Sequence, residues 1–234
     1  MARGVILENE WLTHEWLVEY AKADGSSTLV IPDEAGFRGV VDRAFEGFTG
    51  EEVILPRGVI YIGKGAFKGL ENLRHVVLPA KLEYIDESAF ENCSALESIT
   101  FPDGLKVIRE CAFCACESLE EVIIPSSVVE IGKLAFYRCS SLSTLKIKNG
   151  VKYIGMRAFG DCASLYGFYK WNMPRTMIMK SLSGMIRARY AWEDIFQGSP
   201  CVEGLWKRKA RERRQRRFER QAERYARRMR AREY

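Results

Sequence analysis

Histidine is the rarest residue here, at two among 234, and this leaves little material for His-based catalysis or a His metal site. No apolar run approaches the ~20 residues that a membrane span needs, so we expect no transmembrane segment. Seven prolines and nineteen glycines exclude a collagenous or low-complexity chain. Residues 1–20 offer one apolar run, Val5-Ile6-Leu7 before Glu8, which does not fit a secretory signal.

These absences narrow the function. Without a secretory signal we expect an intracellular protein, cytoplasmic or nuclear, whose seven cysteines are reduced thiols. The cluster Cys111, Cys114 and Cys116 lacks a fourth zinc ligand. Nothing resembles a nucleophile elbow, a phosphate-binding glycine loop or a metalloprotease helix. We therefore predict no enzyme activity, no cofactor, no metal and no small-molecule substrate.

Acidic and basic residues are unevenly distributed along the chain. Residues 1–165 contain 17 Lys and Arg against 24 Asp and Glu, whereas residues 166–234 contain 19 against 7. Within 207–234 the count is 14 against 4. Such shifts indicate boundaries near 165 and 206.

A strict 23-residue repeat dominates the acidic part. Ala-Phe recurs with this spacing at Phe67, Phe90, Phe113, Phe136 and Phe159. Prolines keep the same period at Pro56, Pro79, Pro102 and Pro125, and cysteines at Cys93, Cys116, Cys139 and Cys162. A distorted earlier copy begins at Leu29, which gives six copies over residues 29–165. No single copy can bury its own apolar residues, so the copies are expected to stack as a solenoid.

Each copy predicts one clear strand. Val76-Val77-Leu78 alternates with period two and stops at Pro79, which cannot continue a strand ladder. Leu82 and Ile85 then indicate a second short extended or turn segment. Gly63, Gly132 and Gly155 share one column, where we expect a positive φ. The cysteine column is expected to hold packed, inert thiols.

The pattern resembles the BspA-like class of leucine-rich repeats, whose hallmark is a strand ending in Ile-Pro followed by V-x-x-I-G-x-x-A-F-x-x-C. One copy matches closely, with Ile123-Ile124-Pro125, Val128, Ile131-Gly132, Ala135-Phe136 and Cys139. The resemblance covers residues 29–165 and implies a right-handed parallel solenoid with a strand sheet on one face. Many members are cell-surface proteins of bacteria and protists, and such repeats are generic recognition scaffolds.

The middle residue of each strand is expected to point outward, away from inward pairs such as Val53 and Leu55. This outward column is Ile54, Val77, Thr100, Ile123 and Lys146. Acidic residues lie beside it, among them Glu97, Glu120 and Glu121. We predict that Ile54, Val77, Thr100, Ile123 and these three glutamates bind a protein partner, one with a basic surface. The alternative is that the aliphatic side chains reflect β-propensity alone.

Both ends carry apolar residues that suit caps. Residues 8–22 place Trp11, Leu12, Trp16, Leu17 and Tyr20 at a near-helical spacing, so we predict an N-terminal helical cap over residues 1–28. We predict a second cap over residues 166–206, with a helical stretch at about 175–190. Ile195 and Phe196 are too apolar for a free linker. They are expected either to fold back on the solenoid or to meet a partner.

Residues 207–234 contain no Pro or Gly and favour a long Arg-rich helix. Arginine makes bidentate phosphate contacts and stacks on bases, so RNA is a candidate partner of this tail. The residues expected to bind nucleic acid are Lys207, Arg208, Lys209, Arg211, Arg213, Arg214, Arg216, Arg217 and Arg220. A solvated helix, a protein partner and a nuclear-import signal are the alternatives.

Taken together, the sequence predicts an α/β repeat solenoid of parallel strands with helical caps and a long basic C-terminal helix. The predicted function is a non-enzymatic protein–protein interaction scaffold, whose solenoid face binds protein and whose tail docks on an anionic partner. The alternative is a structural subunit of a ribonucleoprotein particle, held to RNA by the tail.

Overall fold

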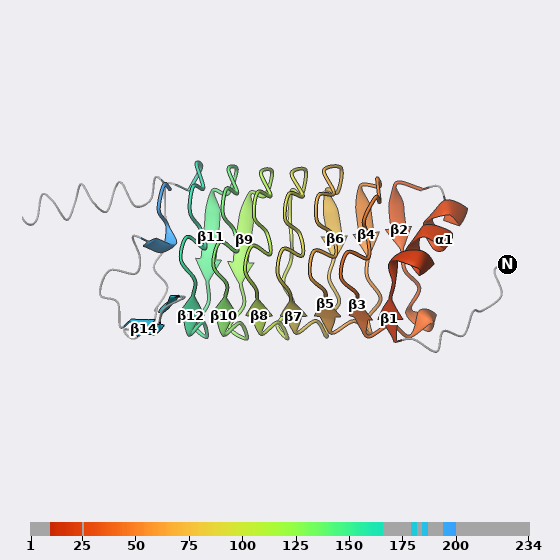
Figure 1. Cartoon of the computed structure of the whole chain (residues 1–234), viewed down its shortest axis with the longest axis horizontal. Coiled ribbons are helices and arrows are strands. Elements are labelled where there is room, and N and C mark those ends of the chain that lie inside the picture. The colour runs from red at the N-terminus through yellow and green to blue at the C-terminus, as the bar shows by residue number, and fades with distance from the viewer. Residues whose placement is uncertain (1–9, 25, 166–178, 182–183, 187–193, 200–234) are drawn as a thin grey trace, which may run out of the picture.

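The structure, a computed structural model, describes residues 10–24, 26–165, 179–181, 184–186 and 194–199. Up to Leu165 the chain coils into a stack of similar turns, whose short strands line up along two sides of the stack (Figure 1). All strand pairs within the stack are parallel and join residues of successive turns. The fold is thus a parallel β-solenoid, as the 23-residue period predicts.

Sheet A consists of two-residue strands in chain order. Each pairs with the strand of the next turn, as Tyr61 pairs with Tyr84 and Ile62 with Ile85. This sheet forms where the sequence predicted only a short extended or turn segment. Its strands are β1 (Trp11–Leu12), β3 (Gly39–Val40), β5 (Tyr61–Ile62), β7 (Tyr84–Ile85), β8 (Val107–Ile108), β10 (Glu130–Ile131) and β12 (Tyr153–Ile154).

Sheet B is built from the strands that precede the proline position of each copy, which is Lys148 after the last strand. Isolated bridges from His75 to Ser98 and from Ser98 to Glu121 connect its two halves. Val53, Val76, Val122 and Leu145 point into the core, which confirms the predicted inward face. Its strands are β2 (Thr28–Val30), β4 (Glu52–Ile54), β6 (His75–Val77), β9 (Glu121–Ile124) and β11 (Thr144–Ile147).

The prediction of an α/β repeat is wrong, because the segment around Ala-Phe forms turns instead of a helix. Two residues in each such turn have a left-handed backbone, for example Ser88 at φ 57° and Asn92 at φ 61°. This conformation interrupts helical hydrogen bonding. The turns bond to one another instead: Phe67 N donates to Ala89 O at 2.7 Å, and Phe90 N donates to Ala112 O at 2.7 Å.

The glycine column also differs from expectation. Gly63, Gly132 and Gly155 are not among the residues with positive φ, which fall two positions later in each copy. Glycine is needed there because successive turns come very close. A Cβ on Gly132 would lie 2.4 Å from the backbone of Arg109.

A ladder of phenylalanine rings fills the core. Neighbouring rings are nearly parallel, with centroids 4.1 Å apart between Phe45 and Phe67 and 5.1 Å apart between Phe113 and Phe136. Every ring in this series is fully buried or nearly so. The column of Cys93, Cys116, Cys139 and Cys162 lies beside the ladder, and each of these thiols donates to a phenylalanine carbonyl of the preceding turn.

The N-terminal end is covered by α1 (His14–Asp24), which lies against the first turn (Figure 1). Leu12 and Leu17 are buried, and the Trp16 ring packs edge-on against Phe37 at 5.0 Å. The helix starts later than predicted, because Trp11–Leu12 pairs with β3 as a strand. Thr13 accepts a hydrogen bond from Trp16 N at 3.3 Å, as an N-cap residue does. The first turn also contains η1 (Asp33–Ala35).

At the C-terminal end, residues 194–199 occupy the place of half a repeat. Phe159 N donates to Ile195 O at 3.0 Å, which is the bond that Phe136 N makes to Ala158 O. The Phe196 ring stacks on Phe159 at 5.6 Å, and Ser199 Oγ donates to Phe159 O at 2.8 Å in place of a cysteine thiol. Ile195 and Phe196 therefore fold back on the solenoid.

The helix predicted at about 175–190 is wrong where the chain is described. Residues there form two short strands, β13 (Met179–Ser181) and β14 (Gly184–Ile186), which pair antiparallel. The basic helix predicted over 207–234 lies outside the described residues. No helix in the described part is long and apolar enough to span a bilayer.

Replacing Phe113 with alanine is expected to destabilise the fold by about 3–5 kcal/mol, because it opens a cavity between two stacked rings. Urea unfolding followed by circular dichroism measures the change. Glu117→Ala, an exposed position on the same turn, serves as the control and should change stability by less than about 0.5 kcal/mol. A loss below about 1 kcal/mol for Phe113→Ala would contradict the ladder as the core of the fold.

Phe196→Ala tests the terminal half-repeat. Loss of this ring exposes Phe159, so we expect a free energy of unfolding lower by about 3 kcal/mol. Gln197→Ala removes only an exposed side-chain bond to Arg157 and is the control, with an expected loss under about 1 kcal/mol. Equal stability of the two variants in thermal unfolding would show that residues 194–199 do not close the solenoid.

Candidate functional site

The outer face of sheet B carries an exposed aliphatic strip. Strand register places Val30 beside Ile54, Ile54 beside Val77, and Ile123 beside Lys146. Val30 is 50% exposed, Val77 48% and Ile123 38%, Thr100 is exposed and Ile54 half-buried. The predicted outward column is therefore on the surface. Val30 extends it by one turn, and sequence reasoning missed it because the first copy is distorted.

Carboxylates flank this strip. Glu97 accepts hydrogen bonds from Arg74 at 2.9 and 2.6 Å, and Glu121 lies 3.1 Å from Lys146 Nζ. Glu120 is exposed and forms no ion pair among the described residues. Two columns of residues at 23-residue spacing flank the strip, one from Glu51 to Ser143 and one from Glu52 to Thr144. Their five glutamates and Arg74, together with Lys146 of the strip, sum to a net charge of −3 when His75 is counted as neutral. The glutamates are Glu51, Glu52, Glu97, Glu120 and Glu121.

A groove of about 520 Å³ interrupts the face near Ser98 and Thr100. Its walls include Glu52, His75 and Val77. The turn that contains Ser98 contributes only isolated bridges to sheet B and no regular strand. It places Phe101 in the core, where other copies have Leu or Ile, and the Phe101 ring packs edge-on against Phe113 at 5.5 Å. The groove therefore lies where sheet B is paired by isolated bridges instead of a regular strand.

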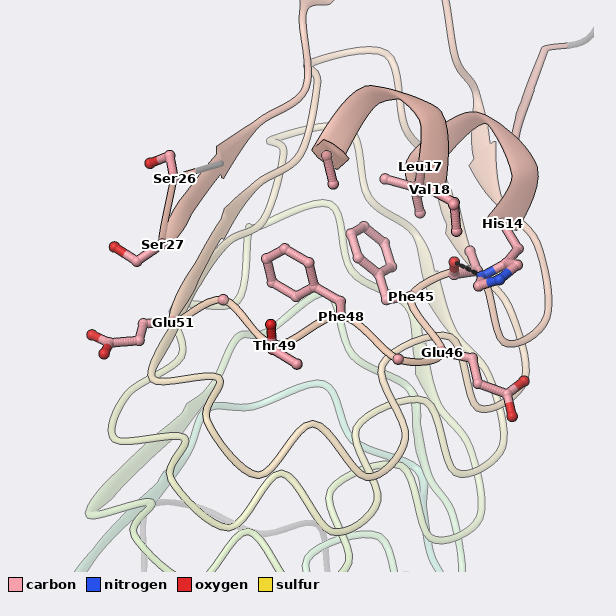
Figure 2. A pocket seen from close by; sticks show the side chains of 14 residues that line it. His14, Leu17, Val18, Ser26, Ser27, Phe45, Glu46, Phe48, Thr49 and Glu51 are labelled. Carbon is pink, nitrogen blue, oxygen red and sulfur yellow. Dashed lines mark hydrogen bonds between the residues drawn. The ribbon is translucent and has the colours of Figure 1, made fainter. Parts of the chain in front are cut away.

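A second hollow, of about 500 Å³, lies between α1 and the first turn. Figure 2 shows the rings of Phe45 and Phe48 turned toward Leu17 and Val18 of the helix. His14 Nδ1 lies 3.1 Å from Ala44 O and closes one side. The hollow lies at the end of the phenylalanine ladder, beside Phe48, whose ring is only partly buried.

Sheet A presents an aromatic column that the sequence analysis did not single out. Tyr61, Tyr84 and Tyr153 share one position of the repeat, so their 23-residue period was a usable signal. Much of this surface is already engaged. The Trp11 ring lies over Gly39 and edge-on to Tyr61 at 5.9 Å, and Tyr61 donates a short hydrogen bond to Asp86. Burial and Asp86 raise the pKa of Tyr61 far above its usual range.

The chemistry of the buried cysteines is limited. Burial raises the pKa of Cys93 to about 12 and holds those of Cys116 and Cys139 well above the ordinary value. The thiolate is the reactive form, so these three are poor nucleophiles. Groups of three or more His, Cys, Asp or Glu that could hold a metal do not occur within the described residues.

Comparison with known families decides the identity of the repeat. The family described as "BspA type Leucine rich repeat region" matches six copies over residues 39–166, more than half of the chain. The chain belongs to this family. Members of the BspA-type leucine-rich repeat family act generally in protein interaction, and neither the match nor the fold points to catalysis.

Similar solved structures are also leucine-rich repeat proteins. A leucine-rich repeat protein of T. pallidum is 36% identical, with a TM-score of 0.58 over 60% of this chain and 67% of that one. A leucine-rich cell surface protein of Faecalibacterium prausnitzii is 27% identical, with a TM-score of 0.52 over 60% of this chain and 43% of that one. A leucine-rich repeat protein of Eubacterium ventriosum, at 22% identity, shares the fold, with a TM-score of 0.61 over 75% and 43% of the two chains. Curated proteins give no significant match.

The BspA-type match ends at residue 166, so the Arg-rich segment lies beyond it. The residues predicted to bind nucleic acid, from Lys207 to Arg220, also lie outside the described residues. The candidate site within the described chain is therefore the outer face of sheet B: the aliphatic strip, its acidic flanks and the groove.

Proposed function

We propose that this BspA-type solenoid is a non-enzymatic protein-interaction scaffold and that the outer face of sheet B docks a basic segment of a protein partner. The observation that carries the proposal is the aliphatic strip flanked by net negative charge. Exposed β-branched residues alone would fit β-propensity. An apolar strip bordered by unbalanced glutamates supports a docking surface, since apolar contact supplies affinity and charge supplies orientation.

The dimensions favour an extended partner. Successive rungs of a sheet are ~4.8 Å apart, so the strip from Val30 to Ile123 runs about 20 Å. An extended peptide along it would place roughly six residues on the face at ~3.3 Å per residue. The groove beside Val77 and Thr100 offers room for one larger side chain of that peptide.

Charge argues against nucleic acid on this face, because glutamates repel phosphates. The ribonucleoprotein alternative rests instead on the Arg-rich tail. The F. prausnitzii neighbour is described as a cell surface protein, whereas we predicted an intracellular location. The scaffold proposal holds in either compartment, since it depends on the sheet face.

The test uses the full-length protein and a displayed library of twelve-residue peptides. We expect bound peptides to be rich in Lys and Arg with interspersed apolar residues. Glu97→Gln, Glu120→Gln and Glu121→Gln together should weaken binding about tenfold, since each exposed charge contact contributes up to ~1 kcal/mol. Fluorescence anisotropy of a selected peptide measures the dissociation constant.

The matched control removes the same number of carboxylates beside sheet A, as Glu83→Gln, Glu110→Gln and Glu130→Gln. This triple variant should bind like the wild type. Equal weakening by both triples would mean that net charge, and not the sheet B face, governs binding. An RNA oligonucleotide that binds the full chain, and loses affinity when Arg213, Arg214, Arg216 and Arg217 become Gln, would favour the ribonucleoprotein alternative instead.

A further inference from the structure

Two cysteines share one turn between β8 and β9. Cys111 and Cys114 are partly exposed, whereas the four cysteines of the repeat column are fully buried. Cys114 N donates to Cys111 O at 3.0 Å, which closes a four-residue turn. The fold thus places two partly exposed thiols at the two ends of one hydrogen-bonded turn.

The turn geometry suits a covalent link. A hydrogen-bonded turn of this span brings its end Cα atoms within ~7 Å, and disulfides join Cα atoms that are ~4.4–6.8 Å apart. The same turn recurs in other copies, where Glu91 N donates to Ser88 O at 3.1 Å and Tyr137 N donates to Leu134 O at 3.1 Å. The closeness of these two columns is therefore a property of the repeat. In one copy both positions hold a cysteine.

We propose that Cys111 and Cys114 are a redox-responsive dithiol that forms a reversible disulfide by exchange with a low-molecular-weight disulfide such as oxidised glutathione. One thiol loses its proton and attacks the glutathione disulfide, which releases one glutathione thiolate. The second thiol loses its proton, attacks the mixed disulfide and releases the second. The pair loses two electrons and two protons, and one glutathione disulfide becomes two thiols.

Burial and the charged groups around the two thiols set the rate of this exchange. Burial raises the pKa of Cys111 to about 11 and also raises that of Cys114, and Glu91 and Glu110 add to the effect on Cys111. Nearby cations oppose this rise: Lys133 lowers the pKa of Cys111, and Arg138 and Lys68 lower that of Cys114. Because a raised pKa keeps the thiols protonated, exchange should be slow at neutral pH. Its rate should rise about tenfold per pH unit while the pH stays below both values.

The sequence allows a direct readout. Cys111, Cys114 and Cys116 lie together in the tryptic peptide of residues 110–133, which has no internal Lys or Arg. The full chain with Cys201→Ser is incubated with oxidised glutathione, and remaining thiols are then blocked with N-ethylmaleimide in denaturant. We expect a peptide with one maleimide and a mass lower by two hydrogens. Dithiothreitol treatment before blocking should restore three maleimides.

The single variants Cys111→Ser and Cys114→Ser are the matched controls. Each should stop at a mixed disulfide with one glutathione on the remaining partner. A stable mixed disulfide in the Cys201→Ser chain, or three maleimides after incubation at pH 9, would overturn the proposal. An exchange rate that does not change between pH 6 and pH 9 would also contradict it.

Discussion

The stacking of phenylalanine rings is the interaction on which the whole molecule depends. From Phe45 to Phe196 each ring lies on the next at 4.1 to 5.6 Å, and the neighbouring turns cover both of its faces within the stack. A turn alone would expose its ring to water. The stack is therefore stable as a set of contacts between neighbouring turns, as in other repeat proteins. The same dependence makes both ends vulnerable, which is why each is closed by a segment outside the regular repeat.

The two closures work differently. At the N-terminal end, α1 brings Trp16 and Leu17 over the first turn and leaves a hollow beside Phe48. At the C-terminal end, residues 194–199 imitate the repeat, with Phe196 in the ring position and Ser199 in the thiol position. Imitation keeps the inter-turn hydrogen bonds in register, since Asp161 N donates to Gln197 O at 2.8 Å. The ring stacking and the inter-turn hydrogen bonds of the repeat thus continue into residues 194–199, which lie outside the 23-residue repeat.

Much of the solenoid was predictable from the sequence, for a physical reason. Identical spacing forces equivalent residues into columns, so Phe113, Cys116 and Val77 could be assigned to core or surface without coordinates. The errors came where the pattern is broken or hidden. Left-handed backbone at Leu134 and Arg157 occurs without glycine, so nothing in the sequence indicated the turns that replace a helix in the predicted α/β class. The half-repeat at Ile195 was obscured by an offset of 14 residues and by serine in place of cysteine.

The regularity that builds the scaffold also limits its chemistry. Charged side chains on successive rungs neutralise each other across the sheet, as Arg74 does with Glu97 and Lys106 with Glu83, and most remain solvated. Such pairs are exposed and do not create the desolvated clusters that activate catalytic groups. Differences among copies must then carry function. On sheet B, Ser98 makes only isolated bridges, and Ser98 and Thr100 line the groove. On the turn edge, a single copy places Cys111 beside Cys114. Recognition by this fold follows from where its repeats depart from one another.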